Sequence, residues 1–289
     1  MYDYSKLHIK DIRQVNTIVH NPLLEFKQTF NKSTSEILEF PLIAKWENWD
    51  IKVFSHSFLE IRGSFHKFWN NGTNENDFCF NKAQETINYL CAKLLLDPNL
   101  VKVCNLEFGV NVCPAFPAKE IIEQVVCYGN SRSLRPYEGK KGFHYIEYKN
   151  RESYIKLYDK GAQYNVGNII RFEIKAMTNR YLNFASIHTL NDLTRIQTMQ
   201  TLGMKINQVL EKLIFKDDTI DIKALSKHDR NNYLLMKDPN EWALCKGNKS
   251  STHRNREKRF TEIVHKYGKR NFQKHISKLV SEKVDYLIS

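Results

Sequence analysis

The chain lacks the features that mark a secreted or membrane protein. Its six cysteines form no C-x-x-C pair, and several lie in apolar patterns, as buried reduced thiols do. No stretch approaches the roughly 18 apolar residues that a membrane span needs. The first residues, MYDYSKLHIKDIRQ, have neither the basic nor the apolar region of a signal peptide. These absences argue against a disulfide framework and a structural zinc site, and they predict a soluble cytoplasmic protein.

Basic residues clearly outnumber acidic ones. The 289 residues include 44 Lys+Arg and 32 Asp+Glu, which gives a formal net charge of +12 and a pI near 9.3. Such an excess favours binding to a polyanion through phosphate contacts and counterion release. A solvated lysine-rich surface has the same composition, so charge alone leaves both interpretations open.

Four short stretches alternate apolar and polar residues, as half-buried strands do: 59–64, 105–111, 154–160 and 170–175. Side chains alternate between the two faces of a strand, so the apolar residues of all four can share one core. They are Leu59, Ile61, Leu106, Phe108, Val110, Ile155, Leu157, Phe172 and Ile174. The opposite face then collects Glu60, Arg62, Glu107, Asn111, Lys156, Tyr158, Lys160, Arg171, Glu173 and Lys175. An amphipathic antiparallel sheet with a merely solvated outer face gives the same pattern.

Helical patterns surround these strands and continue beyond them. Apolar spacing predicts helices at 81–96, near 118–128, at 191–215 and at 222–237. The order predicts an α+β fold, an antiparallel sheet flanked by helices, over residues 1–188. A helical region at 189–245 and a basic helical segment at 246–289 follow. That last segment carries 11 Lys/Arg and two acids between 246 and 278, and its two helices either form a basic helical hairpin or pack on the core.

The ordered blocks resemble the replication initiators of filamentous phages, the gene II and gene X proteins. The blocks are LEIRGSFHKFWNNG at 59–72, CNLEFGVNV at 104–112, SYIKLYDKGAQ at 153–163 and IIRFEIKAMTNRYL at 169–182. The resemblance covers roughly residues 50 to 195, and its specificity comes from the order of the blocks. It implies a nuclease that nicks and rejoins DNA at an origin through a 5′-phosphotyrosyl intermediate and so initiates rolling-circle replication of a phage or plasmid element.

The resemblance places the nucleophile on Tyr158. A phenolate is both a nucleophile and a good leaving group, so the strand can be rejoined. Because the free phenol has a pKa of about 10, a neighbouring cation has to stabilise the charge, and Lys156 and Lys160 are two residues away on either side. Tyr158 is otherwise an ordinary strand tyrosine. Tyr154, which has the same parity, and Tyr148 are the alternatives.

The same resemblance implies a divalent cation, Mg²⁺ or Mn²⁺. Related rolling-circle enzymes hold their metal with a His-hydrophobe-His strand, which neither this chain nor the filamentous-phage type contains. The candidate ligands are Glu107 in the acid position of the central strand, Glu173 of the RFE block, and His66, which otherwise contacts DNA or packs.

DNA is the expected partner, both as a single strand and as the duplex origin. The expected contacts are cationic and aromatic side chains of the blocks and of the basic end of the chain: Arg62, His66, Lys67, Trp69, Arg171, Lys175, Arg254, Arg256, Lys258, Arg259, Lys269 and Arg270. Host replication proteins are a further expected partner, no membrane is expected, and the location is the cytoplasm of a bacterial host. The alternatives are a relaxase that mobilises DNA and a non-catalytic DNA-binding repressor on the same fold.

Overall fold

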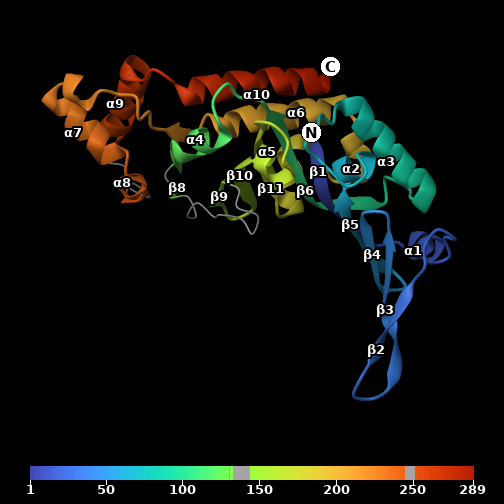
Figure 1. Cartoon of the computed structure of the whole chain (residues 1–289). Helices are drawn as coiled ribbons and strands as arrows, with labels where there is room; N and C mark the ends of the chain where they lie inside the picture. Colours follow the sequence, from blue (N-terminus) through green and yellow to red (C-terminus); the bar gives the residue numbers. More distant parts are fainter. Residues whose placement is uncertain (130, 133–143, 245–250) are drawn as a thin grey trace.

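A large antiparallel sheet forms the centre of the molecule (Figure 1). The structure, a computed structural model, describes residues 1–129, 131–132, 144–244 and 251–289. The expected boundary at residue 246 lies outside these residues. The nine strands follow the order β2-β3-β4-β5-β1-β6-β11-β10-β9. Their bounds are β1 Tyr2–Ile9, β2 Lys27–Asn31, β3 Glu36–Trp46, β4 Trp49–Ser55, β5 Phe58–Ser64, β6 Val101–Val112, β9 Tyr145–Lys149, β10 Ser153–Asp159 and β11 Ile170–Ala176.

The two faces of this sheet divide as the alternation predicts. The four stretches become β5, β6, β10 and β11, and all nine predicted apolar side chains are buried in one core. In the register, Lys156 of β10 lies opposite Glu173 of β11, and Lys175 lies opposite Glu107 of β6. Charged residues from three strands therefore meet on the other face. The predicted α+β fold with an antiparallel sheet is confirmed.

Helices cover the apolar face. They are α3 (Phe80–Leu94), α6 (Ile196–Leu210) and α10 (Phe272–Ile288), and Figure 1 shows α6 and α10 running along one side of the sheet. The buried residues of α10 recur at helical spacing: Phe272, Ile276, Val280, Val284 and Leu287. Each contributes on the order of 1.5–3 kcal/mol through its burial. A Cβ on Gly203 of α6 would lie 2.4 Å from Val284 Cγ1, so glycine permits the close approach of α6 and α10.

A second, smaller core lies beside the sheet. It is formed by strand β7 of the three-stranded sheet β12-β7-β8 and by the helices α7, α8 and α9, while Leu213 and Phe215 of β12 are buried in the large core. The bounds are β7 Val125–Tyr128, β8 Ser131–Arg132, β12 Leu213–Phe215, α7 Lys227–Met236, α8 Pro239–Leu244 and α9 Ser251–Tyr267. Phe260 of α9 packs against Tyr233 and Trp242 in this core. The two C-terminal helices thus pack in different cores: α9 in the small one and α10 on the large sheet.

Two predicted helices end earlier than their patterns suggest. Helix α4 covers only Ala118–Glu123, and the following residues form β7, which pairs with β12. The expected helix at 191–215 divides into the 3-10 helix η2 (Leu190–Thr194), α6 and strand β12. In both cases strand pairing replaces the helical pattern at β-branched or aromatic residues.

Short elements complete the fold. They are α1 (Ile12–Val19), α2 (Phe65–Trp69), α5 (Lys160–Tyr164), and the 3-10 helices η1 (Asn179–Ala185) and η3 (Ile222–Ala224). Strands β2 and β3 extend from the body as a two-stranded arm (Figure 1). Within the described ranges, no helix is both long and apolar enough to cross a membrane.

Candidate active site

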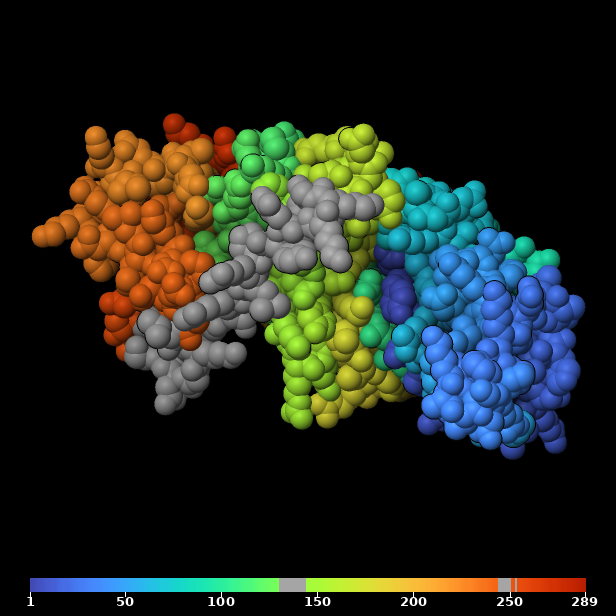
Figure 2. Space-filling view, turned by 60° about the horizontal axis from the view of Figure 1, so that its bottom comes forward, coloured from blue at the N-terminus to red at the C-terminus, as the bar shows by residue number. Residues whose placement is uncertain are grey.

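The polar face of the sheet contains a pocket of about 540 Å³. It combines side chains from β1, β4 and β5 with others from β6, β10 and β11. In Figure 2, the dark blue start of the chain lies in a hollow between the lighter blue segments and the yellow-green ones. Eight of the predicted site residues line the pocket: Arg62, Lys67, Glu107, Lys156, Tyr158, Lys160, Glu173 and Lys175. Seven of the ten residues that alternation assigns to the polar face are among them, and Lys67 is the eighth.

Glu173 lies at the centre of this pocket. It is opposite Gly109 of β6, where a Cβ would meet the Phe172 carbonyl oxygen at 2.3 Å, so a glycine is required for the strands to approach. Lys156 Nζ lies 2.8 Å from Glu173 Oε1, and Arg171 Nε lies 2.8 Å from Oε2. Burial acts to raise the pKa of Glu173, but the cations of Lys156 and Arg171 outweigh it and hold the pKa well below its usual value.

Arg171 is an internal residue. Its guanidinium is 2% exposed and donates to Asp3 Oδ2 at 2.9 Å and to Asn111 Oδ1 at 3.0 Å, in addition to Glu173. The sequence predicts that Arg171 contacts DNA. Its guanidinium is instead buried and connects β1, β6 and β11 through these hydrogen bonds. We therefore assign Arg171 to holding Asp3 and Glu173 in place.

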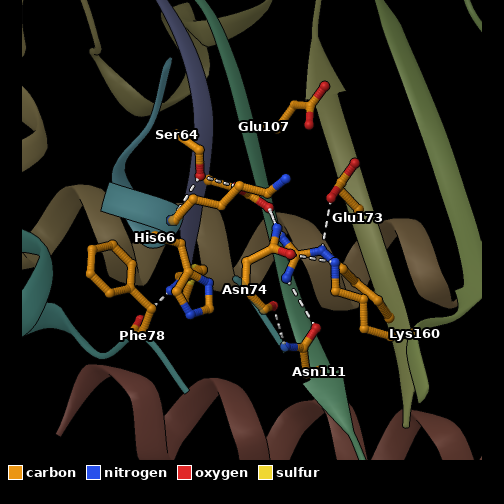
Figure 3. Close-up of polar contacts among 12 residues, drawn as sticks. Ser64, His66, Asn74, Phe78, Glu107, Asn111, Lys160 and Glu173 are labelled. Atoms are coloured by element: carbon orange, nitrogen blue, oxygen red, sulfur yellow. Dashed lines mark hydrogen bonds and ion pairs between the residues drawn. The ribbon is translucent and has the colours of Figure 1, made fainter. Parts of the chain in front are cut away.

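Asn74 connects the loop after α2 to the same network (Figure 3). Its Oδ1 accepts from Lys160 Nζ at 2.6 Å and from the Tyr164 hydroxyl at 2.7 Å, while its Nδ2 donates to Asp3. Lys160 is almost fully buried, and burial together with Arg171 lowers its pKa to about 7. Near neutral pH, the Lys160 amine can therefore exist with or without its proton.

Lys160 is placed differently from the prediction. Strand β10 ends at Asp159, whose side chain accepts from Ala162 N at 2.8 Å and caps helix α5, which begins at Lys160. The ammonium still faces the pocket, 5.5 Å from the centre of the Tyr158 ring.

Tyr158 borders the pocket and is 7% exposed. Its hydroxyl donates to Glu173 Oε2 at 3.4 Å. Burial raises the pKa of Tyr158, and the negative charge of Glu173 raises it further. The hydroxyl is therefore protonated in the resting protein, and a reaction that uses it has to remove the proton during attack.

The structure separates the alternative tyrosines. Tyr148 packs in the core against Tyr128, with 5.7 Å between the ring centres, so it lies on the opposite face of the sheet. Tyr154 keeps the parity of Tyr158 but does not line the pocket. Three tyrosines that sequence reasoning missed, Tyr4, Tyr145 and Tyr164, do line it.

The three predicted metal ligands are not brought together. His66 follows directly after β5, in helix α2, which Ser64 caps. Its imidazole points inward, where it forms a hydrogen bond with Asn76 Oδ1 at 2.6 Å and stacks on Phe78. Burial lowers the pKa of His66 to about 3, and His66 does not line the pocket.

The two predicted carboxylates share the pocket but are bound by cations. Glu107 Oε1 lies 2.8 Å from Lys175 Nζ and 3.5 Å from Lys156 Nζ. Glu173 is paired with Lys156 at one oxygen and with Arg171 at the other. Among the described residues, no group of three or more His, Cys, Asp or Glu is arranged to hold a metal ion. The donor set therefore does not fit the expected Mg²⁺ or Mn²⁺.

The predicted DNA contacts fall into two regions. Arg62, Lys67 and Lys175 line the pocket, and Trp69 on α2 is 41% exposed. At the small core, Arg254, Arg256 and Lys258 are exposed on α9, and Lys269 is exposed just after it. Arg259 and Arg270 form ion pairs with Asp229 and Glu120 at 2.7 and 2.6 Å.

Sequence reasoning missed Asp3 and Asn74. Asp3 lies in β1, where the alternation of Leu7 and Ile9 predicts a strand. The pairing of β1 with β6 shifts register between Tyr2 and Ser5, and Asp3 lies within this irregular part. Asn74 lies in the turn-rich loop 70–77, where composition predicts only a turn. Neither carries a signal that would assign it to the pocket.

Comparisons with known proteins find a likeness among solved structures and none elsewhere. No protein-family model and no curated protein matches the chain. Among solved structures the chain is similar to one described as "Structure of Rolling Circle Replication Initiator Protein from Geobacillus stearothermophilus", with a TM-score of 0.45 and 10% sequence identity. The match covers 78% of this chain and 88% of that one. The protein it describes is a rolling-circle replication initiator, and the description does not mention the filamentous-phage type.

Proposed function

We propose that this protein nicks and rejoins DNA to initiate rolling-circle replication. The observation that carries the proposal is a tyrosine hydroxyl, hydrogen-bonded to a carboxylate, in the wall of a pocket rich in cations. The pocket is lined by six cationic side chains, Lys45, Arg62, Lys67, Lys156, Lys160 and Lys175, against the four acids Asp3, Asp50, Glu107 and Glu173. A phosphodiester is the substrate that matches this excess of positive charge.

The reaction exchanges one phosphate ester for another. The Tyr158 oxygen attacks the phosphorus, a bond forms between them, and the bond to the 3′ oxygen breaks. The Glu173 carboxylate, whose pKa is held low, accepts the hydrogen bond of the hydroxyl and orients it. The hydroxyl proton passes to the Lys160 amine, which is partly unprotonated near neutral pH, and the resulting ammonium gives a proton to the leaving 3′ oxygen. The products are a free 3′-hydroxyl and a 5′-phosphotyrosyl bond, and attack by a 3′-hydroxyl reverses the step.

The lysines supply electrostatic stabilisation. Negative charge builds up on the phosphate oxygens during attack, and ammonium groups already fixed in place stabilise it without having to reorganise. Lys156 and Lys160 face the pocket from β10 and α5, on either side of Tyr158. We propose that the exposed cations of α9 bind duplex DNA while the pocket takes the single strand.

The test is formation of a covalent protein–DNA adduct. The protein is incubated with a random pool of single-stranded oligonucleotides, separated on a denaturing gel, and the attached residue is identified by mass spectrometry. Tyr158→Phe should abolish the adduct while leaving the fold intact, and Tyr154→Phe, a substitution on the same strand outside the pocket, should form it normally.

The outcomes distinguish the alternatives. An adduct on Tyr4, Tyr145 or Tyr164 would keep the reaction but reassign the nucleophile. Binding of the oligonucleotides without any adduct would contradict the proposal and identify a DNA-binding protein without catalysis. Sequencing of the attached DNA gives the recognised motif. A match of that motif to a replication origin or to a transfer origin then separates a replication initiator from a relaxase.

A further inference from the structure

An ammonium group fills the place between the two pocket carboxylates. Lys156 Nζ lies 2.8 Å from Glu173 Oε1 and 3.5 Å from Glu107 Oε1. The position follows from the sheet register, in which Lys156 is opposite Glu173 and Glu173 neighbours β6. Two carboxylates from adjacent strands would otherwise face each other there, which is the arrangement that attracts a divalent cation.

Glu173 Oε2 and both oxygens of Asp3 are also in use. Arg171 occupies Glu173 Oε2, and Lys175 occupies the same Glu107 oxygen that Lys156 approaches. Asp3 accepts from Ser64 at one oxygen and from Asn74 and Arg171 at the other. Mg²⁺ requires near-octahedral oxygen ligands at about 2.0–2.1 Å. To bind here, it would have to displace a lysine and then remain beside that lysine and its neighbours.

Charge leads to the same conclusion. Burial acts to lower the pKa of Lys156, but Glu173 and Glu107 outweigh it and hold the pKa above its usual value, so the ammonium keeps its charge. An ammonium has three N–H donors, of which two are directed at Glu173 and Glu107. The third is left for an acceptor in the pocket that Lys156 lines.

We propose that Lys156 takes the place of a divalent cation in this pocket, so that the protein binds a DNA phosphate through its own ammonium groups and without Mg²⁺ or Mn²⁺. The part of this proposal that concerns cleavage rests on the proposed function. The part that concerns metal binding does not depend on it. The two parts therefore need separate measurements.

The first measurement is Mn²⁺ binding. Binding is detected as a loss of the electron paramagnetic resonance signal of free Mn²⁺. The wild-type protein should leave the signal unchanged. Lys156→Met, which keeps the length but removes the charge, should acquire a Mn²⁺ site, because Glu107 and Glu173 then face each other. Lys175→Met is the matched control, since it removes a cation from Glu107 but keeps Lys156 in place, and it should acquire none.

Wild-type binding of Mn²⁺ that is lost in Glu107→Gln would overturn the proposal. This result needs no activity and no folded Lys156 variant. If Lys156→Met fails to fold, Lys156→Gln serves as the second variant, and a rise in its melting temperature on addition of Mn²⁺ would show the same gain. A folded Lys156→Met or Lys156→Gln protein that binds no Mn²⁺ would also contradict the idea that the ammonium occupies a cation site.

The second measurement is adduct formation in EDTA. We expect the wild-type protein to form the same amount of adduct in EDTA as in Mg²⁺. An adduct that requires Mg²⁺ would overturn the proposal while supporting the nicking reaction. If no adduct forms in either buffer, the proposed function fails, and the Mn²⁺ measurement alone decides the role of Lys156.

Discussion

Removal of one partner from the buried ion pair between Asp3 and Arg171 should cost several kcal/mol of stability. Both side chains are buried, at 5% and 2% exposed, and their atoms are 2.9 Å apart. In Asp3→Asn the shape is kept but the charge is removed, so the buried guanidinium loses one of its two anionic partners. Loss of one partner from a buried pair costs about 3–5 kcal/mol. Because Arg171 keeps Glu173 and Asn111, we expect the lower end, ~3 kcal/mol.

This free energy converts to a measurable shift in melting temperature. With an unfolding entropy of about 2.1 cal/mol/K per residue, the 289 residues give roughly 0.6 kcal/mol/K, so ~3 kcal/mol lowers the melting temperature by about 5 °C. Urea unfolding followed by circular dichroism measures the free energy directly. Asp50→Asn is the matched control, because Asp50 lines the same pocket but is exposed, and its effect should stay within about 0.5 kcal/mol. An Asp3→Asn protein as stable as the Asp50→Asn control would refute the reasoning.

Three further predictions concern binding and packing. Affinity for single-stranded DNA, measured by fluorescence anisotropy, should fall as pH rises through about 7, because the Lys160 ammonium loses its proton there. The Lys160→Arg protein should keep its affinity over the same pH range, because arginine stays charged. An equal decline in both proteins would exclude Lys160 as the cause. Gly109→Ala should destabilise the protein by on the order of 1–3 kcal/mol in urea, since its Cβ would meet the Phe172 carbonyl oxygen at 2.3 Å, whereas unchanged stability would mean that the strands separate without cost. Replacing Arg256 and Lys258 with Gln should weaken duplex binding and reduce the slope of log affinity against log salt by up to about 0.9 per lost phosphate contact, and an unchanged slope would remove α9 from the duplex site.

Alternation along strands was sufficient to predict which side chains share a face. It placed Glu107, Tyr158 and Glu173 correctly on the polar side of the sheet, because a strand period of two does not depend on the neighbours. It could not predict register, so it did not show that Lys156 would lie between the two carboxylates rather than beside them. A metal site was therefore expected where the structure has an ammonium.

Alternation also fails where a strand ends. Ser64 and Asp159 each cap a short helix, so His66 turns into the core while Lys160 still reaches the pocket. Caps of this kind are visible in sequence only as a Ser or Asp beside a turn. Asp3 lay beyond such reasoning for another reason: its place depends on strand order, which is a property of the whole sheet.

The position of β1 in the sheet has a consequence for folding. Strands β2 to β5 follow one another along the chain and in space, so each pairs with a neighbour across a short connection. Strand β1 lies between β5 and β6, and its Leu7 pairs with Ile61 and with Val103. Pairing β1 with β6 joins residues far apart in the chain, and closing that loop loses chain entropy before the new contacts compensate for it. We therefore expect the β1–β6 pairing to form late.

The pocket forms only when that late pairing is complete. Its walls come from both sides of β1, and Asp3 of β1 itself holds Arg171. A partly folded chain can therefore contain the β2–β3 arm and the β4–β5 hairpin without the arrangement of Tyr158, Glu173 and lysines that the reaction needs. The proposed cleavage of DNA strands would in this way be confined to the completed fold.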